Sequence, residues 1–515
     1  MTDKRNSSIV IKTLFWSIIA SIMGYIINLF VTPYVTEKLG VEAYGFVTLT
    51  KTFVDYGALI TTALNSYAMR FIGVEYLRGR YKEANQYYNS VLIADIFLAI
   101  FVLIFAIVFS FSLKESLNVP DNLFIDVQKL FVLSFLNFAI NTVMTVFSSA
   151  AYLKNKLDVN YIFRTIGYSA EILTLLLLFA EFDTRVYYIG IAYVVDSIII
   201  LFSRIWMVKK WTPELKFDFL SFNLEAVKKL VVNGVWNSIN SLGNILNTGL
   251  DLLITDLMLS ATELGLIGVA KTFPTMLIML YQLVSQPFQP LMLKCYSLED
   301  KIGLKKNIEI AMKTSGFVTF IVFSGFVAVG RDFYTLWLPG QDANQLHILT
   351  IIALIPNAIE GIIYPAYYIY TLCVKNKIPC IITIIGGLFN VGGMYFLIKG
   401  SSLGMYAVLI TTVIIMAITT YITNPLYMSK CINVNVKFFY WILIKGVISC
   451  IVMSLAMYLL AHLFVIKSWI ALGLSVIPLV VIGSIIYCLI MLNNDERKLI
   501  KNKIIKMRFL TSYLF

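Results

Sequence analysis

Residues 88–112 read YNSVLIADIFLAIFVLIFAIVFSFS, a stretch in which Asp95 is the single charged side chain. About twenty apolar residues suffice to carry a helix across the hydrocarbon core of a bilayer. That core holds no water to satisfy bare backbone groups, so an apolar stretch of this length must be helical there. The sequence therefore predicts that residues 88–112 span a membrane.

Stretches of the same kind recur on both sides of this segment and nearly fill the chain. Hydrophobic residues make up 59% of the 515 positions and charged residues 14%, well below the roughly 25% of an ordinary soluble domain. We therefore expect an all-α integral membrane protein of about 14 transmembrane helices. The expected spans are 12–36, 42–70, 88–112, 124–151, 160–181, 186–207, 231–257, 264–292, 309–330, 346–371, 378–398, 403–426, 438–464 and 468–492.

Lysine and arginine concentrate in alternate connections between these spans: the N-terminus, the second, sixth and eighth loops and the C-terminal tail. Such segments are retained on the cytoplasmic side of a membrane. We expect both termini in the cytoplasm. The net charge of +12 follows from this bias and requires no nucleic-acid partner.

A weak internal repeat appears when the chain is aligned with itself at an offset of 220 residues. Gly45 then falls on Gly265, and residues 51–53 fall on 271–273, both Lys-Thr-Phe. Six spans separate the copies, so both halves would cross the membrane in the same direction and be related by an axis along its normal. We expect two pseudo-symmetric six-helix lobes at 1–207 and 231–426, joined by a cytoplasmic segment at 208–230 and followed by a helix pair at 427–492 and a basic cytoplasmic tail at 493–515.

Polar side chains line one face of the seventh span, at spacings of three and four: Asn233, Asn237, Asn240, Asn244, Asn247 and Asp251. Two interpretations remain open. Asparagines can join membrane helices by hydrogen bonds, or such a row can form the wall of a hydrated cavity between lobes, suited to sugar hydroxyls. We favour the cavity and assign substrate contacts to Asn237, Asn240, Asn244 and Asn247.

Two lysines lie several turns deep at equivalent positions of the repeat, Lys51 in the second span and Lys271 in the eighth. A cation at such depth is costly and marks a functional site by default. Both are candidate anchors for a phosphate group. Asp55 lies one turn from Lys51, so mutual neutralisation of that pair is the competing interpretation.

Three carboxylates lie near the middle of predicted spans, Glu171, Asp196 and Glu360, with Asp95 nearer the cytoplasmic side. Acids at this depth are what coupling to protons or sodium ions requires. Each could instead pair with a neighbouring cation. We therefore predict Glu171, Asp196 and Glu360 as ion-coupling candidates.

Other chemistry finds little support. The six cysteines and two histidines lack metal-ligand spacing, so neither a metal site nor a disulfide framework is expected. No phosphate-binding glycine loop is present, and the longest polar connection is too short for a nucleotide-hydrolysing domain. We expect no cofactor and no enzymatic activity.

Three motifs resemble lipid-linked oligosaccharide flippases. They are TPYVTEKLGVEAYG at Thr32–Gly45, NSYAMRF at Asn65–Phe71 and SQPFQPLMLK at Ser285–Lys294. The chain is similar in these motifs and in its span pattern to the Wzx-type polysaccharide transporters of the multidrug/oligosaccharidyl-lipid/polysaccharide exporter superfamily.

The resemblance implies a two-lobed bundle in a bacterial cytoplasmic (inner) membrane. It would move an undecaprenyl-diphosphate-linked glycan between leaflets by ion-coupled alternating access, as an antiporter, for O-antigen, lipopolysaccharide, capsule or exopolysaccharide assembly. Membrane lipids, a proton or sodium ion, and a polysaccharide polymerase with its chain-length machinery are the implied partners.

Three alternatives remain. A multidrug exporter or a lipid II flippase would share the superfamily. Lipid II flippases carry several arginines around the central cavity on the first, second and eighth helices, where this chain offers only Lys51 and Lys271. A membrane glycan polymerase would expose a large external loop, whereas no external loop here exceeds roughly fifteen residues.

Overall fold

The computed structural model describes residues 2–154, 156–373 and 375–498, and throughout these ranges the regular structure is helical. The all-α expectation is thereby confirmed. Most of the predicted basic tail, residues 499–515, lies outside the described residues.

The chain divides into two compact units. Unit 1 comprises residues 1–269 and 383–408, and unit 2 comprises residues 270–382 and 409–515. Unit 1 contains α1 (Thr2–Leu39), α2 (Val41–Asn65), α3 (Ala68–Leu77), α4 (Tyr81–Phe111), α5 (Leu113–Ser116), α6 (Phe124–Met144), α7 (Ser149–Leu153), α8 (Leu157–Glu181), α9 (Tyr188–Trp211), α10 (Leu224–Asn244), α11 (Asp251–Met258), α12 (Ala261–Ala270) and most of α18 (Lys377–Gly400).

Unit 2 holds most of the remaining helices, which pack in an order different from their order in the chain. Its helices are α13 (Thr272–Ser285), α14 (Gln289–Ser297), α15 (Lys301–Trp337), α16 (Ala343–Ile363), α17 (Tyr368–Leu372), α20 (Asn424–Ile432), α21 (Lys437–Ala461) and α22 (Trp469–Met491), with most of α19 (Met405–Ile418). Short turns of other helix types interrupt five spans: η1 (Val146–Ser148), η3 (Ile245–Gly249), η4 (Gln286–Phe288), η5 (Tyr364–Tyr367) and η6 (Thr419–Thr423). A further turn, η2 (Phe219–Ser221), lies in the connection between α9 and α10.

Every predicted span is helical in the part of the chain that the structure describes. Twelve of these helical segments are long and apolar enough to cross a membrane. The two that fall short are α2, which carries Lys51 and Asp55, and the α10–α11 segment, which carries the asparagine stripe. Polar residues predicted to line a substrate path, such as Lys51 and the asparagines, lower the hydropathy of these two segments. The predicted total of about 14 transmembrane helices is therefore approximate: twelve segments meet the hydropathy criterion and these two do not.

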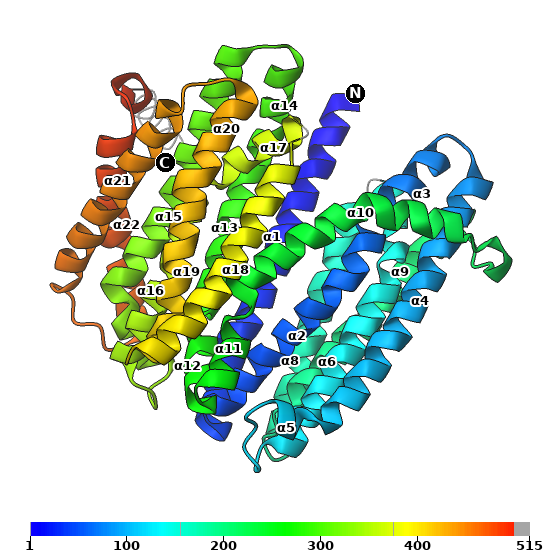
Figure 1. Ribbon diagram of the computed structural model, residues 1–515, viewed down its shortest axis with the longest axis horizontal. Helices are drawn as coiled ribbons and strands as arrows, with labels where there is room; N and C mark the ends of the chain where they lie inside the picture. The colour runs from blue at the N-terminus through cyan, green and yellow to red at the C-terminus, as the bar shows by residue number, and fades with distance from the viewer. Residues whose placement is uncertain (1, 155, 374, 499–515) are drawn as a thin grey trace, which may run out of the picture. The chain divides into compact units, whose positions relative to one another are not determined.

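Within unit 1, α4, α6, α9 and α8 run side by side, and α10 crosses obliquely over α2 and α4 (Figure 1). The crossing is close because Gly234 of α10 lies against the Ala63 carbonyl of α2, where a Cβ atom would collide. Ser238 Oγ fastens the same pair of helices by donating to the Leu59 carbonyl at 2.9 Å. Small residues at such crossings let membrane helices approach closely.

Repeat-equivalent residues meet where α2 and α12 cross. Thr262 Oγ1 donates to Glu42 Oε1 at 2.7 Å, and these residues are 220 positions apart. The backbones of Gly45 and Gly265, also 220 apart, lie so close that a Cβ on Gly45 would stand 2.7 Å from the Gly265 nitrogen. Residues near a two-fold axis contact their own equivalents. The duplication and the lobe boundaries stay predictions, since the compact units group helices by packing.

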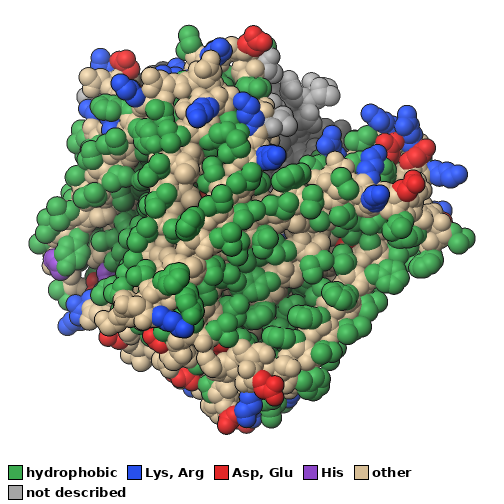
Figure 2. Space-filling view, viewed as in Figure 1, with side chains coloured by type: hydrophobic (Ala, Val, Ile, Leu, Met, Phe, Trp, Pro, Cys, Tyr) green, Lys and Arg blue, Asp and Glu red, His purple; other side chains and the backbone are tan. Residues whose placement is uncertain are grey.

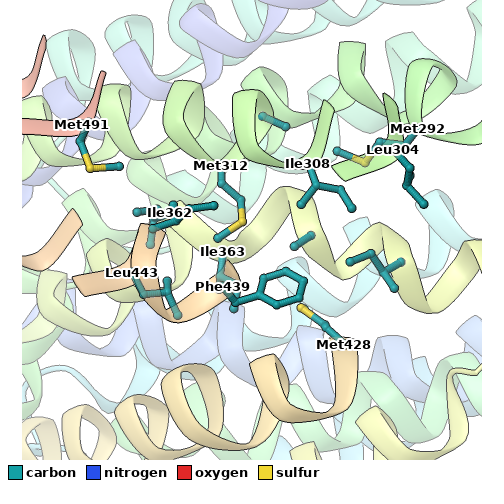
Figure 3. Close-up of a cluster of buried hydrophobic side chains, with 14 of the residues drawn as sticks. Met292, Leu304, Ile308, Met312, Ile362, Ile363, Met428, Phe439, Leu443 and Met491 are labelled. Carbon is teal, nitrogen blue, oxygen red and sulfur yellow. The ribbon is translucent and has the colours of Figure 1, made fainter. Parts of the chain in front are cut away.

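The core of unit 2 is a cluster of methionine, leucine, isoleucine and phenylalanine side chains between α15, α16 and α21 (Figure 3). Met312 and Ile362 are 0% exposed, as is Phe439. Outside such cores the flanks of the helices are covered with hydrophobic side chains, and charged side chains gather at helix ends (Figure 2). Apolar flanks and charged ends are what a bilayer requires of its helices.

Candidate functional site

An ionic cluster joins α8 to α9 inside unit 1. Arg164 Nη1 donates to Asp196 Oδ2 at 3.0 Å, and Asp196 is 5% exposed. Arg164 Nη2 also donates to the Tyr168 hydroxyl at 3.1 Å. Gly167 lies against the carboxylate, where a Cβ atom would collide with Asp196 Oδ1. The glycine therefore lets the acid of α9 approach the backbone of α8.

Glu171, 4% exposed, follows one turn after Gly167 on α8. Asp196, Arg164 and Lys51 all lie close enough to act on it electrostatically. Lys51 itself is exposed on α2 and acts also on Asp55, one turn away. The structure thus brings three predicted site residues, Lys51, Glu171 and Asp196, into one electrostatic neighbourhood.

Arg204 completes the cluster from α9. Its Nη1 donates to the Met144 carbonyl at 3.1 Å, and its charge acts on Asp196. Asp196 is therefore paired with one guanidinium group and acted on by a second, in line with the ion-pair interpretation. The sequence analysis does not predict either arginine as a site residue. Arg204 lies at the end of its predicted span, where it reads as part of the basic loop that follows. The available signal for Arg164 is its helical spacing with Tyr168 and Glu171 within one span.

The asparagine stripe divides into two groups. Asn237, Asn240 and Asn244 of α10 are exposed. Asn247, 5% exposed, lies in η3 and donates from Nδ2 to the carbonyls of Gly243, at 2.8 Å, and Thr383 of α18, at 2.7 Å. The hydrogen bond from Asn247 to Thr383 is an interhelical bond of the kind that the competing interpretation predicts. The assignment of Asn237, Asn240 and Asn244 to a cavity wall stays a prediction.

An open pocket of about 340 Å³ lies between the C-terminal part of α2 and α6. Seven of its eight lining side chains are polar: Thr61, Thr62, Asn65, Ser66, Asn141, Thr142 and Thr145, with Phe138 the exception. Asn141 is held in place by donating from Nδ2 to the Asn137 carbonyl at 2.8 Å. The wall is uncharged and rich in hydroxyl and amide groups, which suits a ligand that offers many hydrogen-bonding groups.

Unit 2 contains the remaining two predicted site residues. Lys271, half-buried, stands at the N-terminal end of α13, and its carbonyl accepts a hydrogen bond from Thr275 Oγ1 at 3.0 Å. Glu360 of α16 accepts a hydrogen bond from the Tyr281 hydroxyl at 3.0 Å. The Tyr281 ring packs 4.8 Å from that of Tyr364, so the acid lies beside tyrosines rather than beside a cation.

Metal chemistry receives no support from the side chains in the described ranges, which contain no group of three or more His, Cys, Asp or Glu residues arranged to hold an ion.

The twelve long apolar helices define a multi-pass membrane protein. Residues 10–294, more than half of the 515-residue chain, match the Polysaccharide biosynthesis protein family, and the chain belongs to that family. This confirms the resemblance found in the sequence motifs.

A relative is the Uncharacterized membrane protein EpsK of Bacillus subtilis (strain 168), which is 28% identical over 429 residues covering 83% of this chain and 84% of the relative. Among solved structures, Lipid II flippase MurJ in an inward closed conformation matches with a TM-score of 0.70 and 17% identity, over 92% of this chain and 98% of MurJ. An inward-facing multidrug resistance MATE family transporter of the MOP superfamily matches with a TM-score of 0.66 and 14% identity, over 79% and 94%. At these identities the solved structures show a shared fold.

Proposed function

We propose that the protein is a flippase that moves an undecaprenyl-diphosphate-linked oligosaccharide from the inner to the outer leaflet of a bacterial cytoplasmic membrane. The observation that carries the proposal is membership of the polysaccharide biosynthesis family together with a fold shared with a flippase and with transporters. The transported glycan would serve the assembly of a surface polysaccharide, and both termini would lie in the cytoplasm.

The polar surfaces of unit 1 support a sugar as the transported headgroup. The pocket between α2 and α6 offers hydroxyl and amide groups without a formal charge in its lining. The exposed asparagines Asn237, Asn240 and Asn244 add further amides on α10. Groups of this kind replace the hydration of sugar hydroxyls with hydrogen bonds, which lowers the cost of moving them through a membrane.

Lysines at equivalent positions of the repeat are the proposed anchors of the diphosphate. Lys51 is exposed on α2 within reach of the electrostatic cluster, and Lys271 stands at the start of α13. Lysine binds phosphate as a compact point charge. Arg164 contributes to the same positive region from α8, although Asp196 neutralises part of its charge.

Ion coupling is proposed to use Glu171 and Glu360. Glu171 lies in the cluster of unit 1, and Glu360 lies beside Tyr281 in unit 2. Asp196, the third candidate, is paired with Arg164, so its proposed role is to hold that cation in place and to respond when the cluster rearranges. A proton or a sodium ion would drive the cycle by alternating access, with the protein working beside a polymerase and chain-length machinery.

The test is transport in proteoliposomes loaded with a fluorescent undecaprenyl-diphosphate oligosaccharide, with leaflet exchange followed by quenching from outside. We expect Lys51→Ala and Lys271→Ala each to slow exchange about ten- to a hundredfold, since a hydrogen bond to a charged group is worth about 1.5–3 kcal/mol. Lys51→Arg and Lys271→Arg should retain part of the rate.

Lys114→Ala is the matched control, because Lys114 is an exposed lysine paired with Asp121 at 2.7 Å on a connecting segment. It should exchange lipid at the normal rate. If both anchor variants flip the substrate normally while their abundance is unchanged, the lysines are structural and the phosphate assignment fails.

A multidrug exporter is the second candidate, because an exporter of that kind shares the fold. The two functions separate in a deletion strain. Loss of surface polysaccharide with unchanged drug resistance supports the flippase, and the opposite result supports the exporter. Exchange of lipid II in the same proteoliposomes tests the third candidate, for which the MurJ fold is the supporting observation.

A further inference from the structure

The polar pocket of unit 1 has a buried acid behind its wall. Asp95 of α4 is 0% exposed, and its Oδ1 accepts a hydrogen bond at 2.8 Å from Nδ2 of Asn65, which lines the pocket. Asn65 is the last residue of α2, directly before the break at Ser66 and Tyr67 that separates α2 from α3. The contact therefore ties the pocket, a helix break and a buried carboxyl group together.

The pairing between Asn65 and Asp95 is half complete. Asn65 Oδ1 and Asp95 Oδ2 are both buried and have no hydrogen-bond partner in the described structure. Each of these unsatisfied buried acceptors is costly. A carboxylic acid and an amide can instead join through two hydrogen bonds, N–H to O and O–H to O. One proton on Asp95 Oδ2 would supply the missing donor.

Among the described residues, no cation forms an ion pair with the carboxyl group of Asp95. The helices packed against α4 include α2, α3, α6 and α10. Along each of these helices, the charged residue closest to the part that packs near Asp95 is, in turn, Asp55, Arg70, Lys129 and Lys229. None of these four forms a hydrogen bond or an ion pair with Asp95 in the described structure. On α4 itself Tyr88 is the nearest buried titratable group toward the N-terminus. An unpaired carboxylate in such surroundings is far less stable than its neutral form.

We propose that Asp95 is a proton-binding site of the pocket, which holds its proton in this state through a two-point pair with Asn65 and releases it to water in the pocket when that pair opens. In the release step the O–H bond of Asp95 breaks, the proton passes to water, and the carboxylate keeps the electron pair. Asn65 is then free to turn toward a ligand in the pocket, and the α2–α3 break loses its fastening to α4. Occupancy of the pocket and protonation of Asp95 are thereby linked.

The first experiment does not depend on transport, although the role of Asp95 in transport rests on the proposed function. Infrared difference spectra of the full-length protein in lipid compare the unchanged chain with Asp95→Asn at neutral pH. The difference spectrum should show loss of a protonated carboxyl band, because asparagine lacks the carboxyl group of Asp95. The amide resembles the neutral acid in shape, so the rest of the spectrum should change little. Asp196→Asn is the matched control: Asp196 pairs with Arg164, so its replacement should remove carboxylate bands instead. If Asp95→Asn removes carboxylate bands, as the control does, rather than a protonated carboxyl band, then Asp95 is ionised and the proposal is wrong.

The second experiment reads the pocket itself. Asn141→Cys places a thiol in the pocket lining, and its labelling rate by a water-soluble reagent is measured relative to an unfolded control at each pH. The relative rate should differ several-fold between mildly acidic and mildly alkaline buffer, and the difference should vanish in Asp95→Asn.

Replacing sodium by choline should leave both rates unchanged. A sodium dependence that Asp95→Asn abolishes would assign a sodium ion to the pair and overturn the proton site. Equal pH dependence with and without Asp95 would show that the acid and the pocket are not coupled. A normal infrared result combined with failed lipid exchange would leave the proton site standing and contradict the flippase assignment.

Discussion

At the scale of single residues, charge inside the membrane domain is organised by a few close partners. Asp196 pairs with Arg164 and also feels the charge of Arg204, and the missing side chain of Gly167 lets it reach the backbone of α8. Burying an ion pair contributes little net stability, yet removing one partner leaves an uncompensated buried charge. The cluster is therefore sensitive to single substitutions even though its net contribution to stability is small.

Arg164→Gln should lower the free energy of unfolding by at most about 3 kcal/mol, the low end for breaking a buried pair, because the Arg164 side chain is 35% exposed. Thermal unfolding of the purified protein measures the loss. Combining it with Asp196→Asn should recover part of the stability. The control is Arg78→Gln, at an exposed pair with Glu75, which should change stability by less than about 1 kcal/mol. Similar losses in Arg164→Gln and Arg78→Gln would show that the buried pair is no more sensitive to loss of one partner than an exposed pair.

Sequence reasoning located buried acids but not their partners. Periodicity identifies the helix on which Glu171 or Asp196 lies, whereas the ion pair to Arg164 depends on how α8 packs against α9. The pair of Asn65 and Asp95 depends likewise on the packing of α4 against the end of α2. Spans and span order could be predicted because hydropathy is a local property, and contacts between helices could not, because they arise from tertiary packing.

At the scale of helices, the seventh predicted span contains two parts, α10 and η3, whose asparagines have different surroundings. Its α10 half presents exposed asparagines, and its η3 turn holds Asn247 against α18. The η3 turn is a π-helix, whose backbone hydrogen bonds join residues i and i+5. Single π-helical turns inside α-helices are frequent at functional sites. Asn247 therefore makes a hydrogen bond between helices, and the cavity interpretation stays a prediction for the exposed asparagines of α10.

Replacing Asn237, Asn240 and Asn244 together with leucine should leave the helix folded, since apolar residues favour insertion, and should block lipid exchange. Asn247→Leu should instead lower the unfolding temperature, since hydrogen bonds between membrane helices are worth around 0.6 kcal/mol each. Exchange and unfolding are measured on both proteins. Intact exchange in a destabilised triple variant would contradict a cavity wall on α10.

A pair of ion pairs, called here the clamp, fastens the segment that follows α22 to α15 in unit 2. Lys313, 7% exposed, lies 2.9 Å from Glu496 and 2.8 Å from Glu309. Burial raises the pKa of Glu496, but the backbone N–H of Asn493 and the charge of Lys313 outweigh it and hold that pKa below its usual value. The clamp therefore stabilises the fold above the unfolded-state pKa of about 4.3 and loses this contribution as pH falls through the lower folded-state pKa.

Glu496→Gln should cost about 1–3 kcal/mol near neutral pH, between the values for exposed and buried pairs. Unfolding is followed as a function of pH in the unchanged and substituted proteins. The difference in stability should shrink toward acid pH. A constant difference across the titration would show that Glu496 acts through packing rather than charge.

At the scale of the whole molecule, the predicted internal repeat is the feature that would link the sequence to the proposed mechanism. The offset of 220 residues, found from a few identities, reappears as direct contacts between Glu42 and Thr262 and between Gly45 and Gly265. If the topology predicted from lysine and arginine holds, this crossing of α2 and α12 lies at the outer side of the membrane. A flippase that works by alternating access must separate such a crossing once in each cycle.

The most direct test of the account is lipid exchange by a protein whose α2–α12 crossing can be locked. Glu42→Cys combined with Thr262→Cys, treated with a short reducible cross-linker, is reconstituted with a fluorescent undecaprenyl-diphosphate oligosaccharide. We predict rapid exchange before cross-linking, arrest after it and recovery on reduction, with either single cysteine variant unaffected by the reagent. Exchange that continues with the crossing fully cross-linked would contradict alternating access at this crossing, and absence of exchange in the unmodified protein would contradict the flippase itself.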